Sequence, residues 1–130
     1  MSAWISLIKE ETTMSLKMDL SEKGLYMFFK PYQVDALKAL WNNPTGMSSK
    51  QVWEAIGSNK ISRASVINFL QDAAENGLLD KHEITGKGGH RGIYHHKYTE
   101  SEFKQHLATA IIDKLITEYP ETTTQATNNI

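Results

Sequence analysis

Residues 86–92 constrain the fold more than any other stretch, because four of these seven residues are glycine. The runs on either side, residues 78–85 and 93–98, have the pattern of β-strands, and a turn-rich segment between two strands is typical of a β-hairpin. Glycine gives the backbone unusual freedom, so residues 86–92 are expected to form a flexible loop. The sequence therefore predicts a two-stranded hairpin with a glycine-rich tip.

Three short amphipathic helices are predicted ahead of this hairpin. They span residues 31–42, 49–56 and 63–76. Pro31 suits the first position of the first helix, and Ser48 and Ser62 suit the N-cap positions of the second and third. The residues expected to face inward are Val34, Leu37, Leu40 and Trp41, then Val52, Trp53 and Ile56, then Val66, Phe69, Leu70 and Ala73. Together with the hairpin, these helices make residues 31–98 one expected domain.

A longer helix is predicted over residues 99–119. It begins with a capping box, in which the Thr99 hydroxyl and the Glu102 carboxylate each accept a hydrogen bond from the other residue's backbone N–H. Its apolar positions span nearly half of the helix circumference, whereas covering a three-helix core needs only one face. We therefore expect this helix to pair with the same helix of a second copy, which makes a homodimer. The expected dimerisation residues are Phe103, Leu107, Ile111, Ile112, Leu115 and Ile116.

The two ends of the chain have weaker patterns. Residues 1–30 are expected to be an N-terminal extension, in which residues 4–8 allow one or two helical turns and the alternation over residues 16–29 indicates a hairpin. Residues 120–130 are polar and carry a single acidic residue. They bury too little apolar surface to offset their ordering entropy, so a disordered tail is expected there.

Composition argues against several classes of protein. The chain has no cysteine, which excludes a disulfide scaffold, a thiolate metal site and a cysteine nucleophile, and fits a reducing, cytoplasmic location. No stretch approaches the roughly 20 apolar residues of a membrane helix, and the first residues lack a signal-peptide pattern. Neither a Gly-x-Ser-x-Gly motif nor a pair of acids with a plausible pocket is found, so we do not expect an enzyme.

Charge is distributed unevenly along the chain, although fourteen basic and fifteen acidic residues give a net charge of −1. Residues 46–98 are the basic part, with seven basic and five acidic residues, whereas residues 99–130 carry two and five. Residues 46–98 also hold His82, His90, His95 and His96. Neighbouring strand residues point to opposite faces, so His95 and His96 are poorly placed to share a metal ion with His90, and no cofactor is expected.

The order of the predicted elements is that of a winged helix-turn-helix. In such a domain the third helix enters the DNA major groove, and the hairpin, or wing, contacts the DNA backbone or the minor groove. The expected fold class is therefore mainly α with a small β wing: a winged helix-turn-helix with a long C-terminal dimerisation helix.

Several segments also resemble one repressor family. They are Pro31-Tyr32-Gln33-Val34, Ala39-Leu40-Trp41, residues 64–70 and Glu75-Asn76-Gly77-Leu78-Leu79. These segments are similar to the penicillinase-repressor family, which includes the methicillin-resistance and copper-transport repressors. The resemblance covers roughly residues 28–118. It implies a homodimeric repressor whose two third helices read the half-sites of a palindromic DNA operator.

The chain departs from this family at the start of the third helix. The family carries two hydroxyl residues before Val66, at positions that Ala64 and Ser65 hold here, with Arg63 ahead of them. Only one hydroxyl is present, so the operator sequence does not carry over from the resemblance. The copper-sensing members need a cysteine cluster, and this chain has no cysteine. Copper is therefore excluded as its signal. The sequence identifies no other effector.

The residues expected to contact DNA come from three places. They are Arg63, Ser65 and Asn68 on the third helix, Ser48, Ser49, Lys50, Lys60 and Ser62 around two helix starts, and Lys87, His90 and Arg91 on the wing. The helix residues have the chemistry to contact base edges. The helix starts offer backbone N–H groups and positive dipole ends to phosphate, and the wing offers cations beside glycine. The alternative for each group is an ordinary solvated surface.

A second function, from a different class, is a winged-helix scaffold that binds other proteins and no DNA. The near-zero net charge favours this alternative. The two functions differ in their response to salt, because the affinity of a DNA-binding protein falls linearly with salt on a log–log plot. A scaffold shows little duplex binding at any salt concentration.

Overall fold

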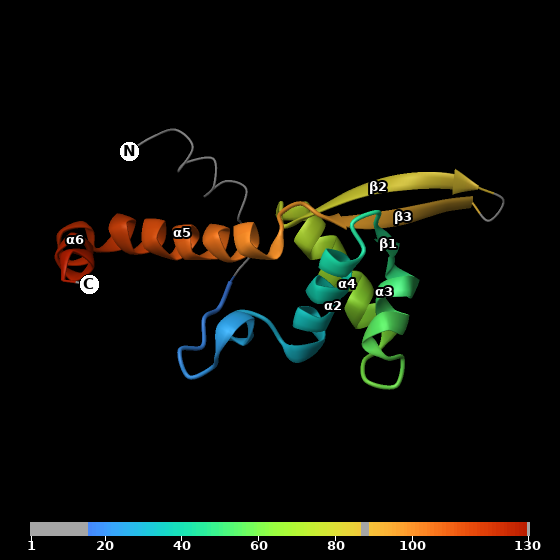
Figure 1. Ribbon diagram of the computed structural model, residues 1–130, viewed down its shortest axis with the longest axis horizontal. Coiled ribbons are helices and arrows are strands. Elements are labelled where there is room, and N and C mark those ends of the chain that lie inside the picture. Colours follow the sequence, from blue (N-terminus) through green and yellow to red (C-terminus); the bar gives the residue numbers. More distant parts are fainter. Residues whose placement is uncertain (1–15, 87–88, 130) are drawn as a thin grey trace.

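The computed structural model describes residues 16–86 and 89–129, with only the backbone described for His90. The chain is mainly helical and has one small antiparallel sheet (Figure 1). The elements are η1 (Gly24–Met27), α2 (Pro31–Asn42), β1 (Met47–Ser48), α3 (Ser49–Ile56), α4 (Arg63–Glu75), β2 (Leu79–Gly86), β3 (Gly89–His96), α5 (Glu100–Glu118) and α6 (Pro120–Asn128).

The structure confirms the four longer helices predicted from the sequence. Each of them begins with a local signal. Ser48 Oγ accepts a hydrogen bond from Gln51 N at 3.2 Å, and Ser48 N donates to Gln51 Oε1 at 2.8 Å, which completes a capping box at α3. Ser62 Oγ accepts from Ser65 N at 3.1 Å at the start of α4. The third predicted helix ends at Glu75, one residue earlier than expected.

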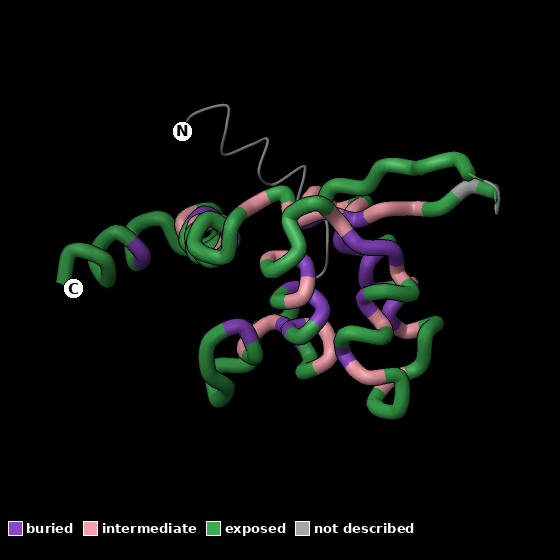
Figure 2. The backbone as a smooth tube through the Cα atoms, turned by 45° about the vertical axis from the view of Figure 1, so that its right-hand side comes forward, coloured by how far each residue is buried: buried purple, intermediate pink, exposed green. Residues whose placement is uncertain are grey.

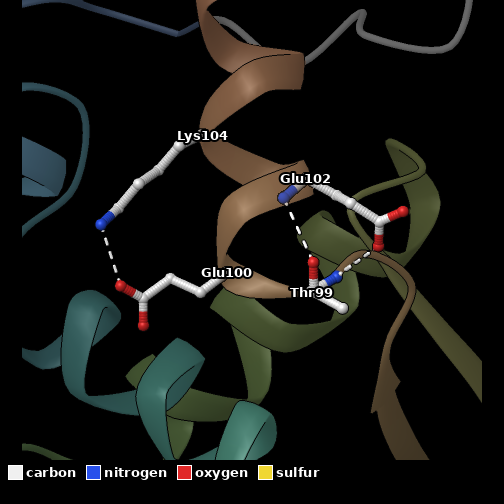
Figure 3. Close-up of polar contacts among 4 residues, drawn as sticks. All are labelled: Thr99, Glu100, Glu102 and Lys104. Atoms are coloured by element: carbon white, nitrogen blue, oxygen red, sulfur yellow. Dashed lines mark hydrogen bonds and ion pairs between the residues drawn. The ribbon is translucent and has the colours of Figure 1, made fainter.

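The start of α5 carries the capping box that the sequence predicts (Figure 3). Thr99 Oγ1 accepts a hydrogen bond from Glu102 N at 3.2 Å, and Thr99 N donates to Glu102 Oε1 at 2.9 Å. The same figure shows Lys104 Nζ at 2.9 Å from Glu100 Oε2, one turn apart on the exposed surface. These contacts define where α5 begins.

The sheet has the strand order β1-β3-β2, so β3 is central. The β2–β3 hairpin is longer than predicted, because Gly86 pairs with Gly89 and only residues 87 and 88 connect the strands. The expectation of a seven-residue flexible loop is therefore wrong: most of these glycines lie in paired strands. Gly89 has a φ of +93°, which suits the first residue after a tight connection.

The core forms where α2, α3 and α4 meet the sheet and the first turns of α5. Its fully buried members include Leu37, Leu40, Val52, Val66, Leu70, Leu78 and Phe103. Trp41 and Trp53 lie at the edge of the core, and each indole N–H donates to a backbone carbonyl, of Tyr98 at 3.1 Å and of Ile61 at 2.9 Å. The Trp41 and Phe103 rings meet edge to face at 5.5 Å, which anchors α5 to α2.

Residues 16–30 differ from the predicted hairpin. Asp19 Oδ1 accepts hydrogen bonds from Ser21 N at 2.9 Å and Ser21 Oγ at 2.6 Å, which forms a turn, and the short η1 helix follows. Leu25 and Phe29 are buried, four residues apart, because a helical turn directs both into the core. Apolar residues that alternate along this segment are therefore buried by a helical turn and not by a strand. The helical turns expected at residues 4–8 lie outside the described residues.

The C-terminal segment also differs from the prediction, since α6 occupies most of the expected disordered tail. Pro120 starts α6 at the favoured first position. Threonine hydroxyls donate to backbone carbonyls here: Thr124 to Pro120 at 2.9 Å and Thr123 to Leu115 of α5 at 3.0 Å. Thr123 is buried, and its bond joins α6 to the end of α5, so α6 is ordered by a contact that the composition of residues 120–130 does not display.

The elements are arranged so that the two ends of the molecule differ. Figure 1 shows α2, α3 and α4 gathered together, the β2–β3 hairpin projecting to one side, and α5 running away on the other side with α6 at its far end. In Figure 2 the buried residues concentrate in the helical body, and the hairpin and α6 are mostly exposed. Among the described helices, none is long and apolar enough to cross a membrane.

Candidate nucleic-acid interface

The outward face of α4 is the first candidate surface. Val66, Phe69, Leu70 and Ala73 of α4 are buried, which fixes the side that faces the core. An α-helix turns by about 100° per residue, so the centre of the opposite face is held by Ala64, Asn68 and Gln71. All three are exposed. We call these residues the α4 row. Of them, only Asn68 was singled out from the sequence.

Ser65 and Arg63 lie at the edges of this face rather than at its centre. Ser65 is half-buried, and its hydroxyl is 2.8 Å from that of Ser62, with which it shares a hydrogen bond. Both serines are thus engaged at the N-cap of α4, which limits their reach toward a ligand. Arg63 is exposed, about 100° around the helix from Ala64.

The two amide side chains of the α4 row are available for binding. Other asparagines of the chain bond to the backbone, as Asn43 Nδ2 does to Ala39 O at 2.8 Å. Within residues 16–86 and 89–129, the structure gives no such partner to the amides of Asn68 and Gln71. Ala64 and Gln71 were missed by the sequence analysis, although the helical period of the buried residues contains the signal that finds them.

The predicted contacts near the start of α3 separate into two kinds. Ser48 is buried, and its hydroxyl and backbone form the α3 capping box, so it is structural and not a surface contact. Ser49 is half-buried, and Lys50 is exposed. Lys60, in the connection between α3 and α4, is also exposed. Lys50, Lys60 and Arg63 therefore give the α3–α4 region exposed positive charge.

Negative charge lies at the opposite end of α4. Asp72 and Glu75 are exposed, and Glu75 continues the α4 row one turn beyond Gln71. A polyanion is therefore attracted to the first turns of α4 and repelled by its last turn.

The β2–β3 hairpin carries the remaining predicted residues. Arg91 is exposed and lies opposite Ile84 in the strand register. His90 pairs with Thr85 through the backbone, and its side chain is not described. Lys87 lies outside the described residues. The hairpin thus brings at least one cation, Arg91, to its surface.

Two histidines tie the base of the hairpin to the loop before β1. His82 Nδ1 and His95 Nε2 are 2.7 Å apart and share a hydrogen bond, with ring centroids 4.6 Å apart. His95 Nδ1 lies 3.4 Å from the Pro44 carbonyl oxygen. In the described part of the chain, no group of three histidine, cysteine, aspartate or glutamate side chains is arranged to hold a metal ion. The pair therefore has a structural explanation: it connects β2, β3 and the Pro44 loop.

A second candidate surface is the distal half of α5. Ile112 and Leu115 are 44% and 43% exposed and lie on one side of the helix, and Tyr119, the residue after the end of α5, is 61% exposed. We call these three residues the α5 apolar face. Ile111 and Ile116 flank it and are half-buried.

Two of the expected dimerisation residues do not belong to this surface. Phe103 and Leu107 are 1% and 3% exposed, in the protomer's own core, so they are not available to a partner. Core and contact positions form one continuous apolar stripe along the helix, which is why both residues were expected at a dimer contact.

Comparison of the chain with family models, with curated proteins and with solved structures finds no match.

Proposed function

We propose that the protein is a homodimeric transcriptional regulator, a repressor, that binds double-stranded DNA sequence-specifically through a winged helix-turn-helix. The observation that carries this proposal is the outward face of α4, with unpartnered amides at its centre and exposed cations near its start. Residues 63–71 of α4 would enter the major groove, as the recognition helix of a helix-turn-helix does. This docking leaves Asp72 and Glu75 in the last turn of α4, beyond the contacted bases.

The β2–β3 hairpin is proposed to act as the wing. Arg91 is exposed on a strand that extends well beyond the helical body (Figure 1), where its guanidinium can reach backbone phosphate. Lys50 and Lys60 supply further phosphate contacts beside α4. Contacts of this kind position a protein on DNA and carry no sequence information of their own.

A second copy of the chain is proposed to cover the α5 apolar face. Figure 1 shows that this half of α5 extends away from the helical body, so the protomer leaves Ile112, Leu115 and Tyr119 open. Lys104 pairs with Glu100 and Lys114 pairs with Glu118, each at 2.9 Å, so two of the four carboxylates of α5 are neutralised within the protomer. A two-fold dimer matches a palindromic operator.

The resemblance to the penicillinase-repressor family supports the same proposal, since it implies a dimeric repressor. The proposal includes a non-catalytic role and a location in the cytoplasm with the chromosome. The second candidate, a protein-binding scaffold, is favoured by one observation: Asp72 and Glu75 on the exposed side of α4. These acids suit a basic protein partner better than DNA.

Binding titrations across a salt series distinguish the two functions. We expect duplex affinity to fall steeply and linearly on a log–log plot of affinity against salt concentration. Arg91→Gln should reduce the magnitude of the slope by about one unit per half-site and weaken all duplexes about equally. Lys23→Gln, which removes the same charge from an exposed position before η1, is the matched control and should leave the slope unchanged. Absence of duplex binding at low salt would favour the scaffold.

A further inference from the structure

The α4 row has a length and a spacing that fit a short run of base pairs. Ala64, Asn68 and Gln71 are separated by four and three residues, so they lie nearly in line along the helix. At 1.5 Å per residue the row is about 10.5 Å long. Successive base pairs are about 3.4 Å apart, so the row spans about three of them.

The side chains of the row share one chemical preference. A carboxamide presents a donor and an acceptor together, and this pair matches N7 and N6 of adenine in the major groove. A methyl side chain packs against the thymine C5-methyl group. Asn68 and Gln71 are exposed, with amides that no described residue binds, and Ala64 presents an exposed methyl. All three positions therefore favour A·T over G·C pairs.

The usual contact to guanine is missing from this row. Arginine or lysine reads guanine by donating to O6 and N7. The only cation of α4 is Arg63, and it lies at the edge of the outward face, about 100° from Ala64. At an edge of the helix, a long cationic side chain is better placed for the phosphates that border the groove than for bases at its centre.

We infer that α4 reads a half-site whose central base pairs are A·T, with Asn68 and Gln71 each contacting an adenine, Ala64 contacting a thymine methyl, and Arg63 contacting phosphate. This inference rests on the proposed function, and it adds the identity of the bases and the residue that reads each of them. It also replaces Arg63 and Ser65 as the expected base-reading residues.

Selection of bound fragments from a random pool of duplexes is the first experiment. We expect A·T pairs at about three neighbouring positions of each half-site. Asn68→Ala and Gln71→Ala should each relax the preference at a different single position, by about 5- to 150-fold in the ratio of affinities for the A·T and G·C duplexes. Arg63→Ala should weaken all duplexes equally. Gln125→Ala, which removes an exposed amide from α6, is the matched control.

Modified bases test the same contacts without changing the protein. Replacing one adenine by 7-deazaadenine removes only the N7 acceptor, and we expect an affinity loss of about 2- to 12-fold. That loss should disappear in the amide variant that reads the same position. Replacing the contacted thymine by uracil removes only the methyl group and should also weaken binding by the wild-type protein.

The possible results separate the two proposals. Specific binding to sites with G·C at the central positions would overturn the inference and leave the proposed function in place. If 7-deazaadenine lowered the affinity of the wild-type protein and of both amide variants equally, the inference would also be overturned and the proposed function would stand. No specific duplex binding would overturn the proposed function and the inference together.

Discussion

At the scale of single residues, Gly46 lies directly before β1, where the loop runs close to β3. Its φ is +102°, a value that L side chains rarely adopt. A Cβ there would lie 2.6 Å from Ile93 Cγ2 and 2.7 Å from His95 Cε1. The His95 ring cannot move away freely, because it bonds to His82 and lies against Pro44. Gly46 thus lets the loop before β1 reach β3.

We predict that Gly46→Ala destabilises the protein by about 1–3 kcal/mol, through backbone strain and the forced displacement of His95. Gly92→Ala is the control. Its Cβ would lie 2.8 Å from Lys81 Cε, the far end of a flexible side chain that can turn aside. Urea unfolding followed by tryptophan fluorescence measures both variants. Equal stability of Gly46→Ala and wild type would show that the loop can relax at no cost.

The sequence predicted some residue roles and missed others, according to where their partners lie. Ser62 was assigned correctly as an N-cap because its partner, Ser65, is three residues away. Gly46 was not singled out, because the atoms that require a glycine belong to Ile93 and His95, which lie 47 and 49 positions further along the chain. Ser65 was expected to contact DNA, and its bond to Ser62 became visible only in the structure.

At the scale of elements, the first turn of α5 depends on its capping box. The Glu102 carboxylate accepts hydrogen bonds from the Thr99 backbone and side chain, and these bonds lower the pKa of Glu102 from its ordinary value; nearby His96 adds a smaller effect in the same direction. A carboxylate with a lowered pKa stabilises the folded state above its unfolded-state pKa. The stabilisation is lost as the pH falls through the folded-state pKa.

We therefore predict that Thr99→Ala lowers the unfolding free energy by about 1 kcal/mol at neutral pH. The stability difference between wild type and Thr99→Ala should shrink as the pH falls below the usual titration range of glutamate, because the wild type then loses the interaction of the Thr99 hydroxyl with the Glu102 carboxylate, which the variant lacks at every pH. Thermal unfolding at a series of acidic pH values measures the difference. A constant difference across that range would mean that the Thr99 hydroxyl does not interact with the Glu102 charge, since the backbone N–H of residue 99 donates to Glu102 in both proteins.

At the scale of elements, local start signals predicted most of the helices well, but not all of them. α2, α3, α4 and α5 each begin at a proline or a hydroxyl cap that the sequence displays. The β2–β3 hairpin was placed correctly, but its strands extend through the glycines, since cross-strand backbone pairing outweighs the local flexibility of glycine. α6 also begins at a proline, but Pro120 was interpreted as the end of the preceding helix, and the bond from Thr123 to Leu115 of α5 is visible only in the structure.

At the scale of the whole molecule, α5 connects the two candidate surfaces. Its start is fixed to the core by the edge-to-face contact of Phe103 with Trp41, whose indole N–H also holds the carbonyl of Tyr98 beyond β3. The hairpin and α5 therefore join at one rigid corner. The sequence could not divide the α5 stripe into core and exposed parts, because that division depends on where the helical body ends.

The last prediction concerns the proposed dimer. We predict that replacing both Ile112 and Leu115 with aspartate yields a monomer, because four unpaired carboxylates would be buried in the contact, at a cost of several kcal/mol. The protomer should keep its unfolding free energy, since both side chains are more than two-fifths exposed in the single chain. Thr122→Asp with Gln125→Asp adds the same charge to exposed positions of α6 and should stay dimeric. Sedimentation velocity distinguishes the species.

The monomeric variant should also bind a palindromic duplex far more weakly than wild type and a single half-site equally well, because only the link between the two α4 helices is lost. A folded variant that remained dimeric would place the contact between copies elsewhere on the molecule.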